Sequence, residues 1–397
     1  MSLHRTLAGC VAGLALMSAR AYAQPAPMVE APAGVMRGAT DGGLQVFKGL
    51  PYAQPPVGRA RWTPPRPLAR WQGVRDATRF GPACVQPVAP ARSSIYAGGA
   101  PLPMSEDCLT LNVWAPKEAR KAPVFFWIHG GALTTGASRD PLYDGAKLAA
   151  RGVIVVSINV RLGVLGYLAH PALSAESPLG VSGNYGLLDE ITALQWVHAN
   201  IAAFGGDPSN VTIAGESSGG LSVLYLMAAP AARGLFAKAI AESSYMISTP
   251  ELKQARYGQP ASEAIGTVLA SKLGASTLAD LRAMDAQTLT NAAAKAGYPP
   301  FGTVDGHVLT KQLVETFDAG EQAPVPVLAG FNSGEIRSLK ILEPPTPASS
   351  ADYEREIRAR YGDLADTFLK LYPSFDLHRS ILAAARDGLY GLSLIHI

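Results

Sequence analysis

Residues 215–220 of the 397-residue chain read GESSGG and directly follow the apolar run VTIA at residues 211–214. An apolar helical pattern at residues 221–227 comes next. This is a G-x-S-x-G sequence between a strand and a helix, a setting in which a tight turn exposes the serine hydroxyl. The flanking glycines remove side chains that would collide, and the helix N-terminus favours negative charge on the Ser217 oxygen. The stretch therefore predicts Ser217 as a nucleophile.

Further apolar runs indicate the sheet that carries this turn. Residues 124–128 (VFFWI), 153–159 (VIVVSIN) and 325–331 (VPVLAGF) show no alternation, which is typical of strands covered on both faces. Apolar residues recur every three or four positions over residues 187–204, which predicts a helix with one buried face. Alternating strands and helices predict an α/β fold with a mostly parallel central sheet and helices on both faces. Nothing marks a second domain, so we interpret residues 24–397 as one domain.

The composition excludes several classes of protein. Hydrophobic residues make up 48% and charged residues 16% of the chain, so a sizeable core can form. Lys and Arg total 34 against 31 Asp and Glu, a balance without the basic surface that a nucleic-acid partner requires. The seven histidines are scattered, and neither Cys-x-x-Cys nor His-Glu-x-x-His occurs. We expect no metal and no other cofactor.

The first 23 residues have the pattern of a secretory signal peptide. His4 and Arg5 precede an apolar run at residues 7–17, and Ala-Tyr-Ala at residues 21–23 provides a cleavage site. No later stretch reaches the roughly 18 apolar residues of a transmembrane segment. We therefore expect a secreted or periplasmic protein that is cleaved near Ala23.

Cleavage would leave Cys84 and Cys108 as the two cysteines of the chain. An even pair in an oxidising compartment is a candidate disulfide. The alternative is a pair of unpaired buried thiols, which the export signal disfavours.

The sequence HGGA at residues 129–132 directly follows the first apolar run. An acyl-transfer enzyme stabilises a tetrahedral oxyanion with backbone N–H donors, which a glycine-rich turn and the residue after the nucleophile, Ser218, can supply. The alternative is an ordinary turn at the end of a strand. Because the turn occurs together with the serine motif and in the right chain order, we favour the oxyanion hole.

Together these segments resemble the type-B carboxylesterases, especially the bacterial para-nitrobenzyl-esterase-like members of the α/β-hydrolase fold. The resemblance extends from about Gly34 to the region of Glu335. Besides the two turns above, the matching segments are residues 49–53 (GLPYA), 55–58 (PPVG), 105–109 (SEDCL), 112–113 (NV), 141–145 (PLYDG), 159 with 161–163 (N, RLG), 183–189 (GNYGLLD) and 204–208 (FGGDP).

The resemblance assigns roles to individual residues. It implies Ser217 as the nucleophile and the backbone N–H groups of Gly131, Ala132 and Ser218 as oxyanion donors. The acid of the family follows Gly-x-Asn-x-x, which matches residues 330–335 and implies Glu335, in agreement with the Ser…Glu…His chain order. The pair Cys84 and Cys108 matches the first disulfide loop of the family.

Three residues depart from the pattern of the family. Ala132 replaces the last glycine of the oxyanion turn, Ser218 replaces the usual alanine after the nucleophile, and Ile336 replaces the glycine after the acid. The first two departures keep the backbone N–H groups. Glu216, beside the nucleophile, has two open interpretations: electrostatic support of an imidazolium, or a buried, hydrogen-bonded acid.

The resemblance implies hydrolysis of small-molecule carboxylic esters through an acyl-serine intermediate. A cholinesterase-like specificity is an alternative, but residues 85–107 lack the tryptophan that would bind a quaternary ammonium. A second alternative is a non-catalytic binding protein on the same scaffold, which the presence of Ser217 and Glu335 disfavours.

The histidine of the triad is not evident after Glu335. His378 and His396 are the candidates, and neither is followed by the glycine of the family pattern. We read His378 as part of a loop before a helix at residues 381–386. The expectation is a carboxylesterase truncated at its C-terminus, which lacks the last part of the sheet and has little or no esterase activity.

Overall fold

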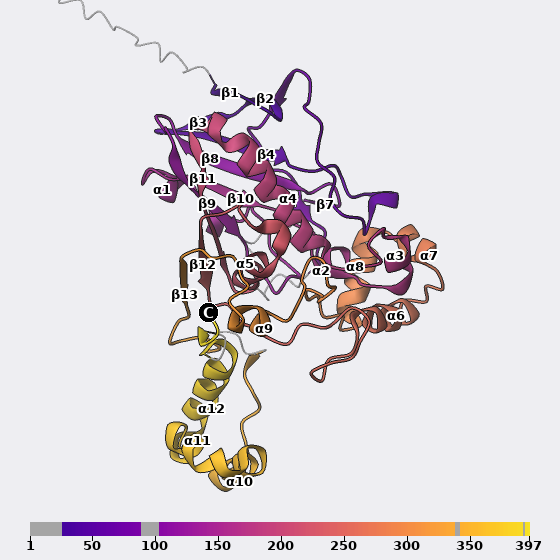
Figure 1. The fold of residues 1–397 in the computed structure, drawn as a ribbon, viewed down its shortest axis with the longest axis vertical. Helices are drawn as coiled ribbons and strands as arrows, with labels where there is room; N and C mark the ends of the chain where they lie inside the picture. Colours follow the sequence, from indigo (N-terminus) through magenta and orange to yellow (C-terminus); the bar gives the residue numbers. More distant parts are fainter. Residues whose placement is uncertain (1–25, 89–102, 338–341, 392–393) are drawn as a thin grey trace, which may run out of the picture.

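An eight-stranded sheet crosses the molecule and carries helices on its faces (Figure 1). The computed structural model describes residues 26–88, 103–337, 342–391 and 394–397, so the predicted export signal at residues 1–23 lies outside the described residues. In spatial order the strands are β13 (Val327–Gly330), β12 (Lys238–Glu242), β11 (Gly206–Glu216), β9 (Ala122–Ile128), β10 (Ile154–Ile158), β8 (Thr110–Pro116), β4 (Leu44–Pro51) and β3 (Ala39–Asp41).

The five strands from β13 to β10 run parallel to their neighbours, whereas β8, β4 and β3 are joined by antiparallel pairing. Every residue of β10 is buried, which explains why its sequence does not alternate. The four predicted strands coincide with β9, β10, β11 and β13. The predicted α/β fold with a mostly parallel sheet is therefore confirmed.

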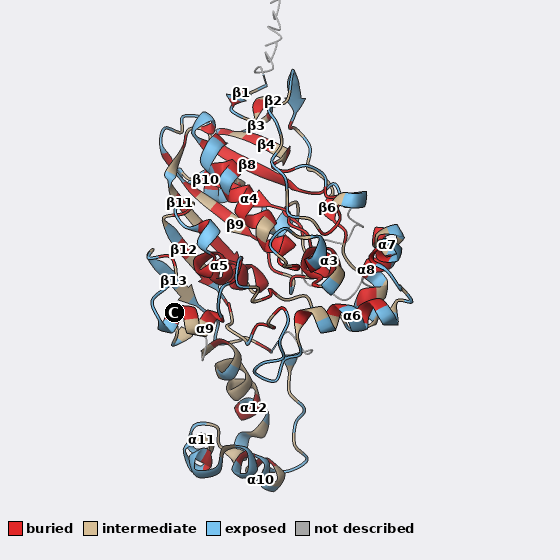
Figure 2. Cartoon of the chain, turned by 45° about the vertical axis from the view of Figure 1, so that its right-hand side comes forward, coloured by how far each residue is buried: buried red, intermediate tan, exposed pale blue. Residues whose placement is uncertain are grey.

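Helices cover both faces of the sheet. On one face, α4 (Tyr185–Asn200), α5 (Ser218–Ala228) and α9 (Leu313–Asp318) share the main hydrophobic core with the strands. A short 3-10 turn, Ile201–Phe204, continues α4 to the end that the sequence predicts. On the other face, α1 (Ala146–Ala149) contacts β8 and β10. Figure 2 shows the buried residues concentrated along the strands, α4 and α5.

Three smaller groups of elements surround this core. Near the N-terminus lies a three-stranded sheet of β1 (Met28–Ala31), β2 (Gly34–Arg37) and β5 (Val74–Asp76). A second hydrophobic cluster contains buried residues of five helices: α2 (Gly163–Tyr167), α3 (Pro171–Glu176), α6 (Ser262–Lys272), α7 (Leu278–Ala283) and α8 (Ala286–Lys295). A third cluster holds α10 (Ser350–Tyr361), α11 (Ala365–Leu371) and α12 (Leu377–Arg386), which project beyond the sheet in Figure 1. None of the described helices is both long and apolar enough to cross a bilayer.

A disulfide joins Cys84 to Cys108. The short strands β6 (Ala83–Cys84) and β7 (Met104–Ser105) pair in parallel and bring the two cysteines together. Next to them, Glu106 forms a two-pronged ion pair with Arg61, whose guanidinium also donates to carbonyl oxygens at the end of α7. The disulfide thus anchors this loop close to a link with the second hydrophobic cluster.

Candidate active site

Ser217 lies at the sharp turn between β11 and α5. Its backbone has φ +58° and ψ −122°, a conformation that is costly for a residue with a side chain and is typical of functional turns. A Cβ added to Gly215 would lie 2.4 Å from the backbone of Gly219, and one added to Gly219 would lie 2.2 Å from the Ile128 carbonyl oxygen. The strand and the helix are therefore too close at this turn for larger residues. Ser217 remains partly exposed.

The glycine-rich turn after β9 lies beside this serine. A Cβ added to Gly130 would lie only 3.3 Å from Ser217 Cβ, so the two turns are in close contact. Gly131, Ala132 and Leu133 all have positive φ, at +111°, +56° and +56°. The Leu133 N–H donates to Ser218 Oγ over 3.1 Å. The structure thus places Ser217 and Ser218 next to the turn that contains Gly131 and Ala132.

His129, at the start of this turn, is not placed to exchange protons with a substrate. Its ring is buried, and Nδ1 lies 2.8 Å from the Gly130 carbonyl oxygen. Burial lowers the pKa of His129 below its ordinary value. A neutral ring bonded to its own turn supports the backbone there.

Glu335 lies in the turn after β13, at the same carboxyl ends of the parallel strands as Ser217. Its Oε1 atom accepts hydrogen bonds from Ser243 Oγ at 2.5 Å and from the backbone and side-chain nitrogens of Asn332 at 3.0 and 3.1 Å. Ser243 is the residue directly after β12, and the carbonyl oxygen of the preceding Glu242 accepts from the Ser217 N–H. Glu335 is therefore connected to the serine turn through the end of β12.

Ile336, which replaces the glycine of the family pattern, has φ +76° and is buried. A β-branched residue is strained at this φ, whereas glycine is not. Isoleucine thus replaces glycine at a position whose backbone conformation glycine would adopt more easily.

Glu216 faces other carboxylates at this edge. Burial, and after it the negative charges of Glu335 and Glu242, raise the pKa of Glu216 to about 7. The described contacts include no hydrogen bond to the Glu216 carboxylate. The group does titrate close to neutral pH beside Ser217.

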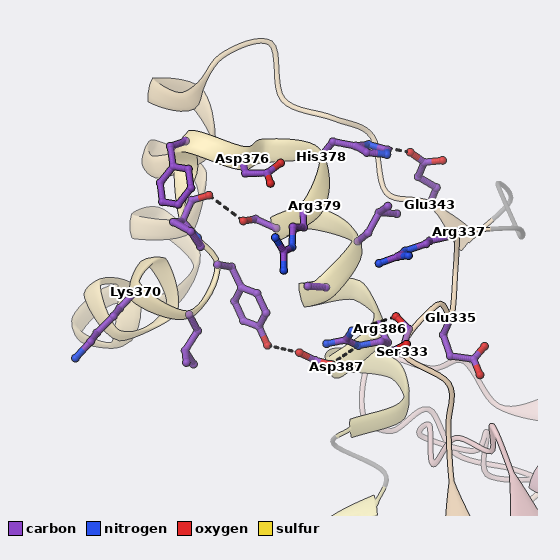
Figure 3. Close-up of a pocket in the computed structure, with 17 residues that line it drawn as sticks. Ser333, Glu335, Arg337, Glu343, Lys370, Asp376, His378, Arg379, Arg386 and Asp387 are labelled. Carbon is purple, nitrogen blue, oxygen red and sulfur yellow. Dashed lines mark hydrogen bonds and ion pairs between the residues drawn. The ribbon is translucent and has the colours of Figure 1, made fainter.

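The two histidines after Glu335 lie beside other carboxylates. His378 Nδ1 lies 3.6 Å from Glu343, and His396 Nδ1 lies 2.8 Å from Asp318 on α9. Glu335 and His378 line the same cavity of about 1010 Å³, yet they lie apart on its wall, and His378 turns toward Glu343 (Figure 3). The sequence interpretation of His378 as a loop residue was wrong, because α12 begins at Leu377 and contains it. Within the described parts of the chain, no histidine contacts Glu335 or Ser217.

Sequence reasoning missed Ser243. Its signal in the sequence is weak, because Glu-Ser-Ser at residues 242–244 contains no recognisable motif. The backbone carries the better signal: Ser243 has φ +47°, held by a hydrogen bond from its N–H to the Gly330 carbonyl oxygen. This contact depends on the pairing of β12 with β13, which the sequence does not reveal.

Taken together, the sheet order and the serine turn between β11 and α5 define an α/β-hydrolase fold. Comparison with known proteins gives the family: the family model described as "Carboxylesterase family" matches residues 25–370, and the chain belongs to this family. The predicted family is therefore confirmed.

The relatives and solved structures agree with this assignment. A fumonisin B1 esterase from Sphingopyxis macrogoltabida is 40% identical over 346 residues, which cover 84% of this chain and 61% of that protein. A para-nitrobenzyl esterase from Bacillus subtilis (strain 168) is 51% identical over 213 residues, which cover 53% of this chain and 42% of that protein. The solved structure of a PNB esterase superposes with a TM-score of 0.78 at 35% identity, over 93% of this chain and 75% of that one. The chain thus spans about half the length of these two curated relatives.

Proposed function

We propose that this chain carries the nucleophile, the oxyanion donors and the acid of a hydrolase for small-molecule carboxylic esters. The observation that carries the proposal is the strained, partly exposed Ser217 between β11 and the buried helix α5, with the oxyanion turn linked to the next residue by the hydrogen bond from the Leu133 N–H to Ser218 Oγ. Esterase relatives support the same chemistry. Nothing in the proposed reaction calls for a metal or another cofactor.

In the first half of the reaction, Ser217 Oγ attacks the ester carbonyl carbon and passes its proton to a base. The C=O bond becomes a C–O⁻ bond, whose charge is stabilised by the N–H groups of Gly131, Ala132 and Ser218. The intermediate then collapses, the C–O bond to the alcohol breaks, and the alcohol leaves with the proton held by the base. Water repeats these steps on the acyl-serine and releases the acid. Glu335 would orient and stabilise the base as it becomes charged.

We assign the role of base to neither His378 nor His396, because among the described contacts neither touches Ser217 or Glu335 and each lies beside another carboxylate. Added imidazole is a small base that can stand in for the histidine of a triad. The proposal therefore predicts ester cleavage by the 397-residue chain that depends on both imidazole and Ser217.

One specific observation favours a second candidate, a non-catalytic binding protein on the same scaffold. This observation is the separation of both histidines from Ser217. The two candidates differ in whether Ser217 forms a covalent bond with an ester.

Release of p-nitrophenolate from p-nitrophenyl butyrate, with and without imidazole, tests the proposal. Imidazole alone cleaves such esters, so the Ser217→Ala variant in the same buffer sets the background. We expect a faster rate with the unchanged chain than with the variant. Equal rates at every imidazole concentration would favour the binding protein.

Export is part of the proposal. We propose that residues 1–23 are a signal peptide and that residues 24–397 form a carboxylesterase domain in a secreted or periplasmic protein. The Cys84–Cys108 disulfide supports this location, because disulfides persist in oxidising compartments.

A further inference from the structure

The hydroxyl group of Ser218 makes a contact that ester hydrolysis itself does not require. Ser218 is the first residue of α5, and its backbone N–H is a proposed oxyanion donor. Its Oγ atom accepts a hydrogen bond from the Leu133 N–H over 3.1 Å. Ser218 and Leu133 are both buried, with 1% and 6% of their surfaces exposed.

Leu133 belongs to the most strained part of the oxyanion turn. Ala132 and Leu133 both have φ +56°, a region in which side chains raise the energy of the backbone. Such a conformation persists only when surrounding contacts fix it. The N–H of Leu133 bonds to Ser218 Oγ, and its carbonyl oxygen accepts from the Gly163 N–H over 2.7 Å. The peptide groups on both sides of Leu133 are thus fixed, one of them by the helix that follows the nucleophile.

We propose that the Ser218 hydroxyl is a positioning group. It keeps the backbone N–H groups of Gly131 and Ala132 correctly placed relative to the Ser218 N–H, so that all three can bind the oxyanion. Ser218 then serves the oxyanion twice, directly through its backbone and indirectly through its side chain. An alanine at this position would keep the backbone donor and would leave the buried Leu133 N–H without this acceptor. The inference rests on the proposed ester hydrolysis, and it gives a physical reason for the serine that replaces the usual alanine.

Ser218→Ala tests this role, because alanine fits the space and favours a helix. The matched control is Ser222→Ala, which removes another buried hydroxyl from α5 that donates to Glu190 rather than contacting the oxyanion turn. The readout is the acylation rate of the full chain in imidazole with p-nitrophenyl butyrate and with its thiono analogue, after subtraction of the Ser217→Ala background. A sulfur atom is a weaker hydrogen-bond acceptor than oxygen, so the ratio of the two rates reports on the oxyanion donors.

We expect Ser218→Ala to lower the ratio of ester to thionoester rates about fivefold, the loss that one net hydrogen bond represents. Ser222→Ala should leave this ratio unchanged even if it lowers the stability of the chain. Hydrogen exchange at the Leu133 amide should become faster in Ser218→Ala than in the unchanged chain.

Two results separate failure of the inference from failure of the proposed function. Faster exchange at Leu133 with an unchanged rate ratio would overturn the positioning role and leave a structural hydrogen bond. Absence of Ser217-dependent acylation in the unchanged chain would overturn the ester hydrolysis on which the inference rests.

Discussion

Ser243 Oγ donates a hydrogen bond of 2.5 Å to Glu335 Oε1, and the residue before Ser243 accepts the backbone N–H of Ser217. The proposed acid and the proposed nucleophile are therefore fixed to the same end of β12. Ser243 holds a left-handed backbone conformation at this point, with φ +47°. Such strain is typical of residues whose position matters more than their local stability.

We predict that Ser243→Ala slows imidazole-dependent acylation of Ser217 about tenfold, because a hydrogen bond to a carboxylate contributes about 1.5–3 kcal/mol. The control is Ser244→Ala, the next residue, whose buried hydroxyl has no hydrogen-bond partner among the described contacts. Acylation is measured as p-nitrophenolate release above the Ser217→Ala background. Equal rates for the Ser243 and Ser244 variants would show that the contact does not position Glu335.

A second prediction concerns Glu190, which lies on α4 beneath the helix that carries the serine turn. Burial raises the pKa of Glu190 to about 8, although the hydrogen bond from Ser222 Oγ partly opposes this effect. The unfolded chain binds this proton with an ordinary pKa near 4.5. The folded state therefore holds more protons between these values, and its stability falls as the pH rises from about 4.5 through about 8.

Glu190→Gln should remove this dependence, because an amide keeps the shape of the protonated acid without titrating. We expect the variant to gain roughly 4–5 kcal/mol in the free energy of unfolding at pH 9 and little at pH 4.5. Urea unfolding of both proteins at the two pH values measures the difference. A constant difference across the range would contradict a protonated Glu190 in the folded protein.

A third prediction concerns the disulfide. Cys84 and Cys108 are 24 positions apart, and a bond that closes a loop of about this size stabilises a protein by roughly 3 kcal/mol. The double variant Cys84→Ser/Cys108→Ser should lose stability of this order in urea unfolding. Thiol counting on the denatured, unreduced secreted protein should find no free thiol. Two reactive thiols would contradict both the bond and the proposed export.

The histidines provide a fourth prediction. Because His378 and His396 lie beside Glu343 and Asp318 rather than beside Ser217 or Glu335, we predict little ester turnover by the 397-residue chain without imidazole. His378→Ala and His396→Ala should then leave the imidazole-dependent rate unchanged. Robust turnover without imidazole that one of these substitutions abolishes would identify that histidine as the base.

How far the sequence predicts this structure depends on how local each feature is. The buried strand β10 was recognisable because burial on both faces leaves an unbroken apolar run. In contrast, β12 has an exposed lysine at its start and an exposed glutamate at its end, and nothing in its sequence distinguished it. The serine turn was predictable because its glycines are needed within a few residues of one another.

The contacts that complete the site depend on distant segments and were not predictable. Glu335 reaches Ser243 because Glu242 pairs with Gly330 across β12 and β13, and no sequence pattern defines that register. The bond between Ser218 and Leu133 joins residues 85 positions apart. The helix that the sequence predicts from Ile381 begins four residues earlier, at Leu377, and therefore includes His378.

The central claim is that Ser217 is the nucleophile, and covalent labelling with a fluorophosphonate measures this directly. The serine oxygen attacks phosphorus, fluoride leaves, and the adduct is located by peptide mapping in a mass spectrometer. We predict imidazole-dependent labelling of the peptide that contains Ser217, and none at this peptide in Ser217→Ala. Labelling that is absent from this peptide, or that persists in the variant, would contradict the account.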